Sequence, residues 1–127
     1  MKQEVLAEGA PAPIGPYSQG IRTSGPLLFV AGQTPKDPAT GEIPQDFRGQ
    51  VERCLQNVKA IVEKAGGTMA DVVKVNAYLS DLANFAVFNE IYAKFFQKPF
   101  PARTTVGAAL PGAAVQVEID VVVSLSR

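Results

Sequence analysis

The stretch PFPARTTV, residues 99–106, is followed by a Leu-Pro-Gly corner and by VQVEID, residues 115–120. Runs rich in Thr and Val that are bounded by Pro and Gly are typical of β-strands, so this pattern predicts two neighbouring strands joined by a turn. The first strand carries the guanidinium of Arg103 and the second the carboxylate of Glu118. Because an arginine fork grips planar carboxylates and an acidic group can hold or activate water, the pair predicts a minimal site for hydrolysing a small organic acid.

A simpler interpretation of this pair stays open, since cross-strand arginine and glutamate side chains also form structural salt bridges. Two features favour a site. The prolines before Arg103 hold the start of its strand rigidly, and Thr105 offers a hydroxyl ~7 Å further along the same face. The site hypothesis requires Arg103 and Glu118 to face one shared crevice, built by more than one copy of the chain.

Composition narrows the chemistry. At 127 residues the chain is expected to form a single domain over residues 1–127, and its formal net charge is zero. Without a basic run, binding to nucleic acid or to an anionic membrane through bulk charge is disfavoured. There is no histidine and only one cysteine, Cys54, so zinc sites and imidazole bases are excluded and no metal or cofactor is expected. No apolar run reaches the ~18 residues of a membrane span, which favours a cytoplasmic protein.

Apolar residues recur at spacings of three and four in two segments, which predicts two amphipathic helices. The first spans residues 47–65, with Asp46 as its N-cap and Gly66 as its stop. The second spans residues 85–96, and the prolines at 99 and 101 forbid its continuation.

Six β-like runs surround these helices, and we expect a strand in each of them: residues 5–7, 20–23, 27–32, 72–79, 102–109 and 115–125. The second and third runs are expected to form a hairpin. The order predicts an α+β fold with a mixed six-stranded sheet and both helices on one face. The other face of the sheet, which includes the side of Arg103 and Thr105, then needs a partner, so a homo-oligomer is expected.

Further candidate residues each have a structural alternative. Tyr17 ends a proline-stiffened loop and is either a cover for the core or a hydrogen-bond donor over a pocket. Asn89 lies near the aromatic stripe of the second helix, where local backbone can also satisfy it. Gly32 could present a bare amide to a ligand or simply make a turn. Asp120 shares the face of Glu118 and belongs either to the site or to an interface, whereas Cys54 is expected in the core.

Five motifs, in order and spread over essentially the whole chain, resemble the RidA (YjgF/YER057c/UK114) family. They are IGPYSQG (residues 14–20), VAGQTP (30–35), FNEIY (88–92), PARTTV (101–106) and VEID (117–120).

The resemblance implies a chorismate-mutase-like fold, a homotrimer whose sheets form a central barrel, and active sites between subunits. It also implies cofactor-free deamination of reactive 2-imino acids and their enamine tautomers, such as 2-iminobutanoate and 2-iminopropanoate, to 2-oxo acids and ammonia. The family's carboxylate-binding arginine falls on Arg103 and its water-orienting glutamate on Glu118. Its other substrate-binding positions fall on Tyr17, Gly32, Asn89 and Thr105.

Two positions depart from the family pattern. Thr105 stands where many members carry cysteine, which puts thiol-dependent regulation in doubt, and Ala31 stands where serine is frequent. Three other functions stay open. A non-catalytic sensor of small carboxylates would use Arg103 but not Glu118. An RNA-cleaving translation inhibitor is disfavoured by the absence of histidine and the zero net charge. No sequence feature bears on a chaperone-like holdase.

Overall fold

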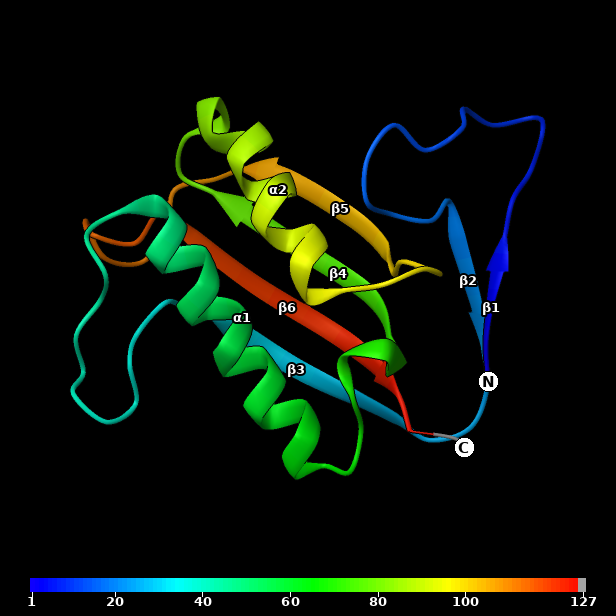
Figure 1. Ribbon diagram of the computed structural model, residues 1–127, viewed down its shortest axis with the longest axis horizontal. Helices are drawn as coiled ribbons and strands as arrows, with labels where there is room; N and C mark the ends of the chain where they lie inside the picture. Colours follow the sequence, from blue (N-terminus) through cyan, green and yellow to red (C-terminus); the bar gives the residue numbers. More distant parts are fainter. Residues whose placement is uncertain (126–127) are drawn as a thin grey trace.

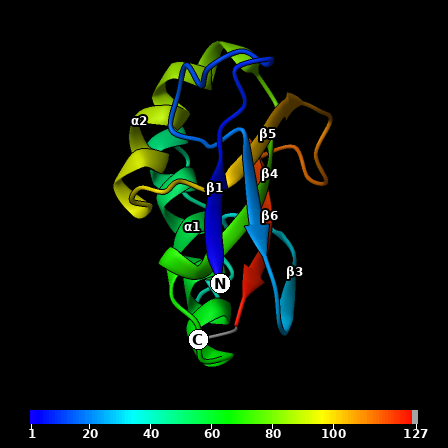
Figure 2. The same ribbon diagram turned by 90° about the vertical axis from the view of Figure 1, so that its right-hand side faces the viewer.

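The computed structural model describes residues 1–125, and both helices cover one face of a four-stranded sheet in it (Figure 1). The sheet has the strand order β3-β6-β4-β5, in which only the β4–β5 pair is parallel. Its strands are β3 (Leu27–Gln33), β4 (Val72–Leu79), β5 (Ala102–Gly107) and β6 (Val117–Ser124). Seen from the side, α1 and α2 lie together and leave the opposite face of the sheet uncovered (Figure 2).

The two remaining strands, β1 (Lys2–Val5) and β2 (Gly20–Thr23), form a separate antiparallel ladder beside the sheet. One isolated parallel bridge, between Ser18 and Ala102, joins the segment before β2 to the start of β5. This bridge places the proline-rich loop that precedes β2 against the edge strand that carries Arg103.

Helix α1 (Phe47–Lys64) begins and ends where its sequence signals predict. The Asp46 carboxylate accepts a hydrogen bond from the backbone N–H of Gly49 at 2.9 Å, which satisfies one of the donors that every helix start leaves unpaired. At the other end Gly66 has a φ of +91°, a left-handed conformation that glycine adopts without steric cost.

Helix α2 (Phe85–Phe95) is shorter, and a single 3₁₀ turn (Leu82–Asn84) precedes it. A second 3₁₀ turn (Met69–Asp71) leads into β4. The core lies between the helices and the sheet. Alternate residues of β4 and β6, among them Val75, Ala77 and Ile119, are buried under α1 and α2, while their neighbours in sequence face the uncovered side.

The α+β class, the six strands and the two helices on one face are confirmed, with three corrections. The strands form two sheets, of two and four strands, instead of one. The hairpin expected between residues 20–23 and 27–32 is wrong, because β2 pairs with β1 and β3 pairs with β6. The runs that carry Arg103 and Glu118 are not neighbours, because β4 lies between β5 and β6. Strand β6, which is apolar along one whole face, instead occupies a central position of the sheet.

Candidate functional site

Arg103 lies on edge strand β5, with its side chain on the helix-covered face of the sheet. In the parallel ladder Arg103 pairs with Val75 of β4, a core residue, and paired residues point to the same side. Four aromatic rings surround the guanidinium. The distances from Arg103 Cζ to the ring centroids are 4.8 Å for Tyr92, 5.5 Å for Phe88, 5.7 Å for Tyr17 and 5.8 Å for Phe85. Cation–π attraction of this kind holds a guanidinium without neutralising it.

Three of these rings come from one stripe of α2. Residues 85, 88, 89 and 92 follow the spacing that brings side chains to the same helix face, so Asn89 belongs to the stripe together with the rings. The fourth ring, that of Tyr17, is held by its loop. Ser18, the next residue, donates from its backbone N–H to the carbonyl of Pro101 at 3.1 Å, and the backbone N–H of Ile14 donates to the Tyr17 hydroxyl at 3.3 Å.

Unsatisfied polar groups gather at this point. Among the residues that the structure describes, four buried side-chain nitrogen or oxygen atoms lack a hydrogen-bond partner: Arg103 Nη1, Thr105 Oγ1, Asn89 Oδ1 and Tyr92 OH. Thr105 is two residues from Arg103 on the same face of β5, and the other two lie on the α2 stripe. Because an unpaired buried polar group costs about 1–3 kcal/mol, such a cluster marks a place prepared for a ligand.

Within residues 1–125 the guanidinium also has no acidic counter-ion. The ion pair found among the described residues joins Arg48 to Glu90 at the surface, with Nη2 and Oε2 2.8 Å apart. Burial lowers the pKa of Arg103, opposed by the nearby phenols of Tyr92 and Tyr17. Arginine nevertheless stays charged in proteins, so a half-buried positive charge is left to attract an anion.

Glu118 and Gly32 form a second group on the uncovered face. Glu118 pairs with Tyr78 across the β6–β4 ladder and borders a cavity of about 250 Å³. Strand β3 has a bulge between Val30 and Gln33 that brings the backbone of Gly32 against the glutamate. A Cβ atom added to Gly32 would overlap Glu118 Oε2, so the glutamate keeps this position only because residue 32 has no side chain. Besides Gly32, Tyr78 and Glu118, the cavity is lined by Ala108, Ala109, Leu110, Pro111 and Asp120.

Asp120 on the same face is already engaged. Its carboxylate accepts hydrogen bonds from the Asn76 amide at 2.9 Å and from the Tyr78 hydroxyl at 3.0 Å. The bond from Tyr78 raises the pKa of that phenol. Asp120 therefore links β6 to β4. Glu118 is the other carboxylate that lines this cavity, and it makes no such hydrogen bond with a described residue.

The expectation that Arg103 and Thr105 lie on the uncovered face of the sheet, together with Glu118, is wrong, because Arg103 and Thr105 both lie on the helix-covered face. Arg103 is in register with Val75 and Glu118 with Tyr78, and these two β4 residues point to opposite sides. The structure thus brings Tyr17, Asn89, Arg103 and Thr105 together on the helix side, and Gly32 with Glu118 on the uncovered side. A single chain cannot place one small molecule between the two groups.

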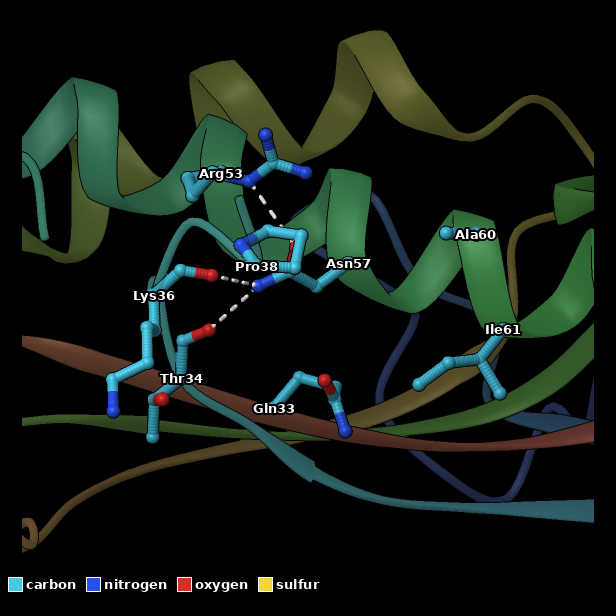
Figure 3. Close-up of a pocket in the computed structure, with 8 residues that line it drawn as sticks. All are labelled: Gln33, Thr34, Lys36, Pro38, Arg53, Asn57, Ala60 and Ile61. Carbon is cyan, nitrogen blue, oxygen red and sulfur yellow. Dashed lines mark hydrogen bonds between the residues drawn. The ribbon is translucent and has the colours of Figure 1, made fainter. Parts of the chain in front are cut away.

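A cavity of about 380 Å³ lies elsewhere, between α1 and the loop after β3, as Figure 3 shows. Its polar side chains serve the fold. Asn57 donates to the carbonyls of Thr34 and Lys36 at 3.0 and 2.8 Å and accepts from Arg53 Nε at 3.2 Å, which fastens the loop to the helix. No predicted site residue lines this cavity.

Further observations concern the thiol of Cys54, possible metal ligands and possible membrane-spanning helices. Cys54 is buried in α1, as expected for a core residue, and its thiol donates to the carbonyl of Gln33 at 2.9 Å. Burial raises the pKa of this thiol to about 12. Within residues 1–125 no group of His, Cys, Asp or Glu side chains is placed to hold a metal ion. No helix in that part of the chain has the length and apolar character needed to cross a bilayer.

Sequence reasoning missed the aromatic residues around Arg103, because the pattern of Phe85, Phe88 and Tyr92 indicates only an apolar stripe of α2. A usable signal is present in the sequence. Asn89 is a polar residue inside that stripe, and a polar side chain on a buried face needs a partner.

Known proteins share both the sequence and the fold. The sequence model of the endoribonuclease L-PSP family matches residues 7–125. The chain is 46% identical to a RutC family protein of Pyrococcus horikoshii, over 96% of this chain and 97% of the relative. It is 42% identical to the 2-iminobutanoate/2-iminopropanoate deaminase of Escherichia coli K12, over 96% and 97% of the two chains.

A solved structure extends the likeness to three dimensions. RidA from an Antarctic Psychrobacter superimposes with a TM-score of 0.76 at 39% identity, covering 97% of this chain and 99% of that one. Family match, sequence identity and fold agree with the motifs around Tyr17, Arg103 and Glu118. The chain therefore belongs to the RidA (YjgF/YER057c/UK114) family, whose sequence model carries the description endoribonuclease L-PSP.

Proposed function

We propose that this protein is a cofactor-free deaminase that hydrolyses reactive 2-imino acids and their enamine tautomers to 2-oxo acids and ammonia. The substrates we propose are small, of the size of 2-iminobutanoate and 2-iminopropanoate. The observation that carries the proposal is the half-buried Arg103 guanidinium, which has aromatic neighbours, no acidic partner among the described residues and unpaired polar atoms around it. The Escherichia coli relative named for this activity supports it.

In the proposed mechanism the substrate carboxylate binds Arg103 through paired hydrogen bonds. Four rings limit the movement of the guanidinium, so little side-chain freedom is lost on binding. The bound carboxylate fixes the position of the C=N carbon. Asn89 and Thr105, each with a buried polar atom that lacks a partner, lie on the same side of the sheet and are the residues we propose for the other polar contacts of the substrate.

The hydrolytic step needs a water molecule and a group that moves protons. Glu118 accepts a proton as the water adds to the imine carbon, and the C=N double bond becomes the C–N single bond of a carbinolamine. The same carboxyl group passes this proton to the imine nitrogen, which completes the carbinolamine. It then takes the proton of the carbinolamine hydroxyl and delivers it to the nitrogen as well, so that ammonia leaves and the carbonyl of the 2-oxo acid forms. General acid–base help of this kind contributes ~10²–10⁴-fold, which suffices for a substrate that is already electrophilic.

The opposite-face arrangement requires that Arg103 and Glu118 come from different chains. We propose a homotrimer in which the uncovered sheet faces turn toward a central barrel. Each site forms where the Arg103 group of one chain (Tyr17, Asn89, Arg103 and Thr105) meets the Glu118 group of the next chain (Gly32 and Glu118). Support comes from that face itself, where Phe29 is 71% exposed and Leu27 43%. Exposed apolar residues on an uncovered sheet face are typical of a surface that another chain covers.

A coupled assay tests the activity. An amino-acid oxidase or dehydratase generates a panel of 2-imino acids, and ammonia release is followed with and without the protein. Arg103→Ala and Glu118→Gln should each lower the rate to near that of the uncatalysed reaction. Arg48→Ala is the matched control, because Arg48 forms only an exposed ion pair with Glu90. Wild-type rates in Arg103→Ala would refute the assignment.

A sensor of small carboxylates is the second candidate, and it is favoured by the separation of the two groups within one chain. It would need Arg103 and its rings but no proton-transfer group. Glu118→Gln distinguishes the two functions, because a sensor would keep its affinity and its response while a hydrolase would lose turnover.

We also propose that the enzyme works in the cytoplasm and that its role there is to remove damaging metabolites.

A further inference from the structure

Tyr92 occupies a position where phenylalanine would serve the fold equally well. Its side chain is fully buried, and its ring lies between those of Phe88 and Phe96, with centroid distances of 5.5 and 4.5 Å. The hydroxyl is buried too and makes no hydrogen bond with any described residue. Burying a hydroxyl without a partner disfavours the folded state, so its presence calls for an explanation outside the packing of the core.

Tyr92 is a neighbour of Arg103 and of the other residues with unpartnered polar atoms. Of the four rings around the guanidinium, that of Tyr92 is the nearest, at 4.8 Å. Asn89, one helical turn before Tyr92, and Thr105, on the strand beneath, each hold another unpartnered atom. Burial raises the pKa of Tyr92, with Arg103 opposing, so the phenol is protonated at neutral pH and available as a donor.

We propose that Tyr92 is a substrate-binding residue of the Arg103 site, and that its hydroxyl donates a hydrogen bond to the substrate carboxylate held by the guanidinium. The inference rests on the proposed function, because the carboxylate is that of the 2-imino acid. Two carboxylate oxygens accept up to about four hydrogen bonds, which matches donors from Arg103, Tyr92 and Thr105.

The four unpartnered atoms also indicate which other groups the ligand carries. Asn89 Oδ1 is the one unpartnered atom of the four that can only accept a hydrogen bond. A ligand that fits all four atoms therefore combines a carboxylate with a neighbouring N–H. A 2-imino acid has both groups, whereas its 2-oxo acid product has lost the N–H, so the cluster should bind substrate more tightly than product.

A buried water molecule bound by the same four atoms is the competing explanation for the hydroxyl, and Tyr92→Phe separates the two. The variant keeps the ring, its packing and its contact with Arg103, and removes one oxygen atom. If the hydroxyl has no hydrogen-bond partner until a ligand binds, its removal leaves the melting temperature of the unliganded protein unchanged or raises it. If water or protein satisfies it, removal breaks a hydrogen bond and the melting temperature falls.

Binding of 2-oxobutanoate, the product, is measured by titration calorimetry on the full-length protein, and turnover by the coupled imine assay. We expect Tyr92→Phe to weaken 2-oxobutanoate binding by about 10- to 100-fold, the usual effect of losing a hydrogen bond to a charged group. KM for the imine should rise more than kcat falls. Thr23→Val is the control. It removes a hydroxyl that donates to the Met1 carbonyl at 2.6 Å, far from this cluster in the separate β1–β2 ladder, and should leave the Kd unchanged.

A lower melting temperature of Tyr92→Phe together with a wild-type Kd and KM would overturn the inference and leave the proposed function standing. A wild-type protein that neither binds 2-oxobutanoate nor releases ammonia from any imine in the panel would overturn the proposed function, and the inference with it. The two failures are thus distinguishable in one set of experiments.

Discussion

Replacing Gly32 with alanine should abolish most of the activity and leave the fold intact. A Cβ atom at position 32 would overlap Glu118 Oε2 and lie 3.0 Å from its Cδ and 3.3 Å from its Cγ. Ordinary contacts between such atoms are about 3.5–4.0 Å, so the carboxylate must move by roughly 1 Å or rotate away. A displacement of this size at a reacting group can cost ~10²-fold in rate, and we expect a loss of about that size in kcat.

The fold should tolerate the change, because the atoms that must move form the end of a flexible side chain beside a cavity. Position 32 also lacks the positive φ that would make alanine strained. Gly20→Ala is the matched control, since its added Cβ meets nothing nearer than the Cβ of Val5 at 3.8 Å. Ammonia release from 2-iminobutanoate and the thermal melting temperature are measured for both variants. Full activity in Gly32→Ala, or a melting temperature that collapses with it, would show that this reasoning about Glu118 is wrong.

Two further predictions concern stability. Asp46→Ala removes the N-cap of α1 and should cost about 1 kcal/mol of the free energy of unfolding, measured by urea denaturation; an unchanged midpoint would contradict the capping role. Burial raises the pKa of the Cys54 thiol from its ordinary value of 9.0 to about 12, so the contribution of this thiol to stability is fully present below about pH 9 and is lost as the pH rises toward 12. Urea midpoints between pH 8 and 11 should fall more steeply for the wild type than for Cys54→Ala, and parallel curves would refute this.

Local patterns predicted the elements that local interactions decide. The strand at residues 72–79 has the predicted bounds, and α1 follows from Asp46, an apolar stripe and Gly66, all of which act within a few residues of one another. The first strand lies at Lys2–Val5, earlier than the run expected at residues 5–7.

The pairing between strands that are distant in the chain could not be predicted from the sequence. The insertion of β6 between β3 and β4 depends on which strands bury most apolar surface together, and no residue near Gly25 or Pro111 indicates it. The register of the β4–β5 ladder then decides which face Arg103 takes, because a shift by one residue would turn it to the other side. The roles of Tyr17, Asn89, Arg103, Thr105, Gly32 and Glu118 remain predictions, although the structure groups them into two sets.

The central claim is that Arg103 of one chain and Glu118 of another form each site, and mixed oligomers test it most directly. Arg103→Ala and Glu118→Gln chains, each inactive alone, are denatured together in equal amounts, refolded and assayed for ammonia release. With random assembly a site receives a wild-type arginine from one chain and a wild-type glutamate from its neighbour with a probability of one half for each, so we predict recovery of about a quarter of the wild-type activity. Mixed oligomers that form but show no more activity than either variant alone would contradict the account.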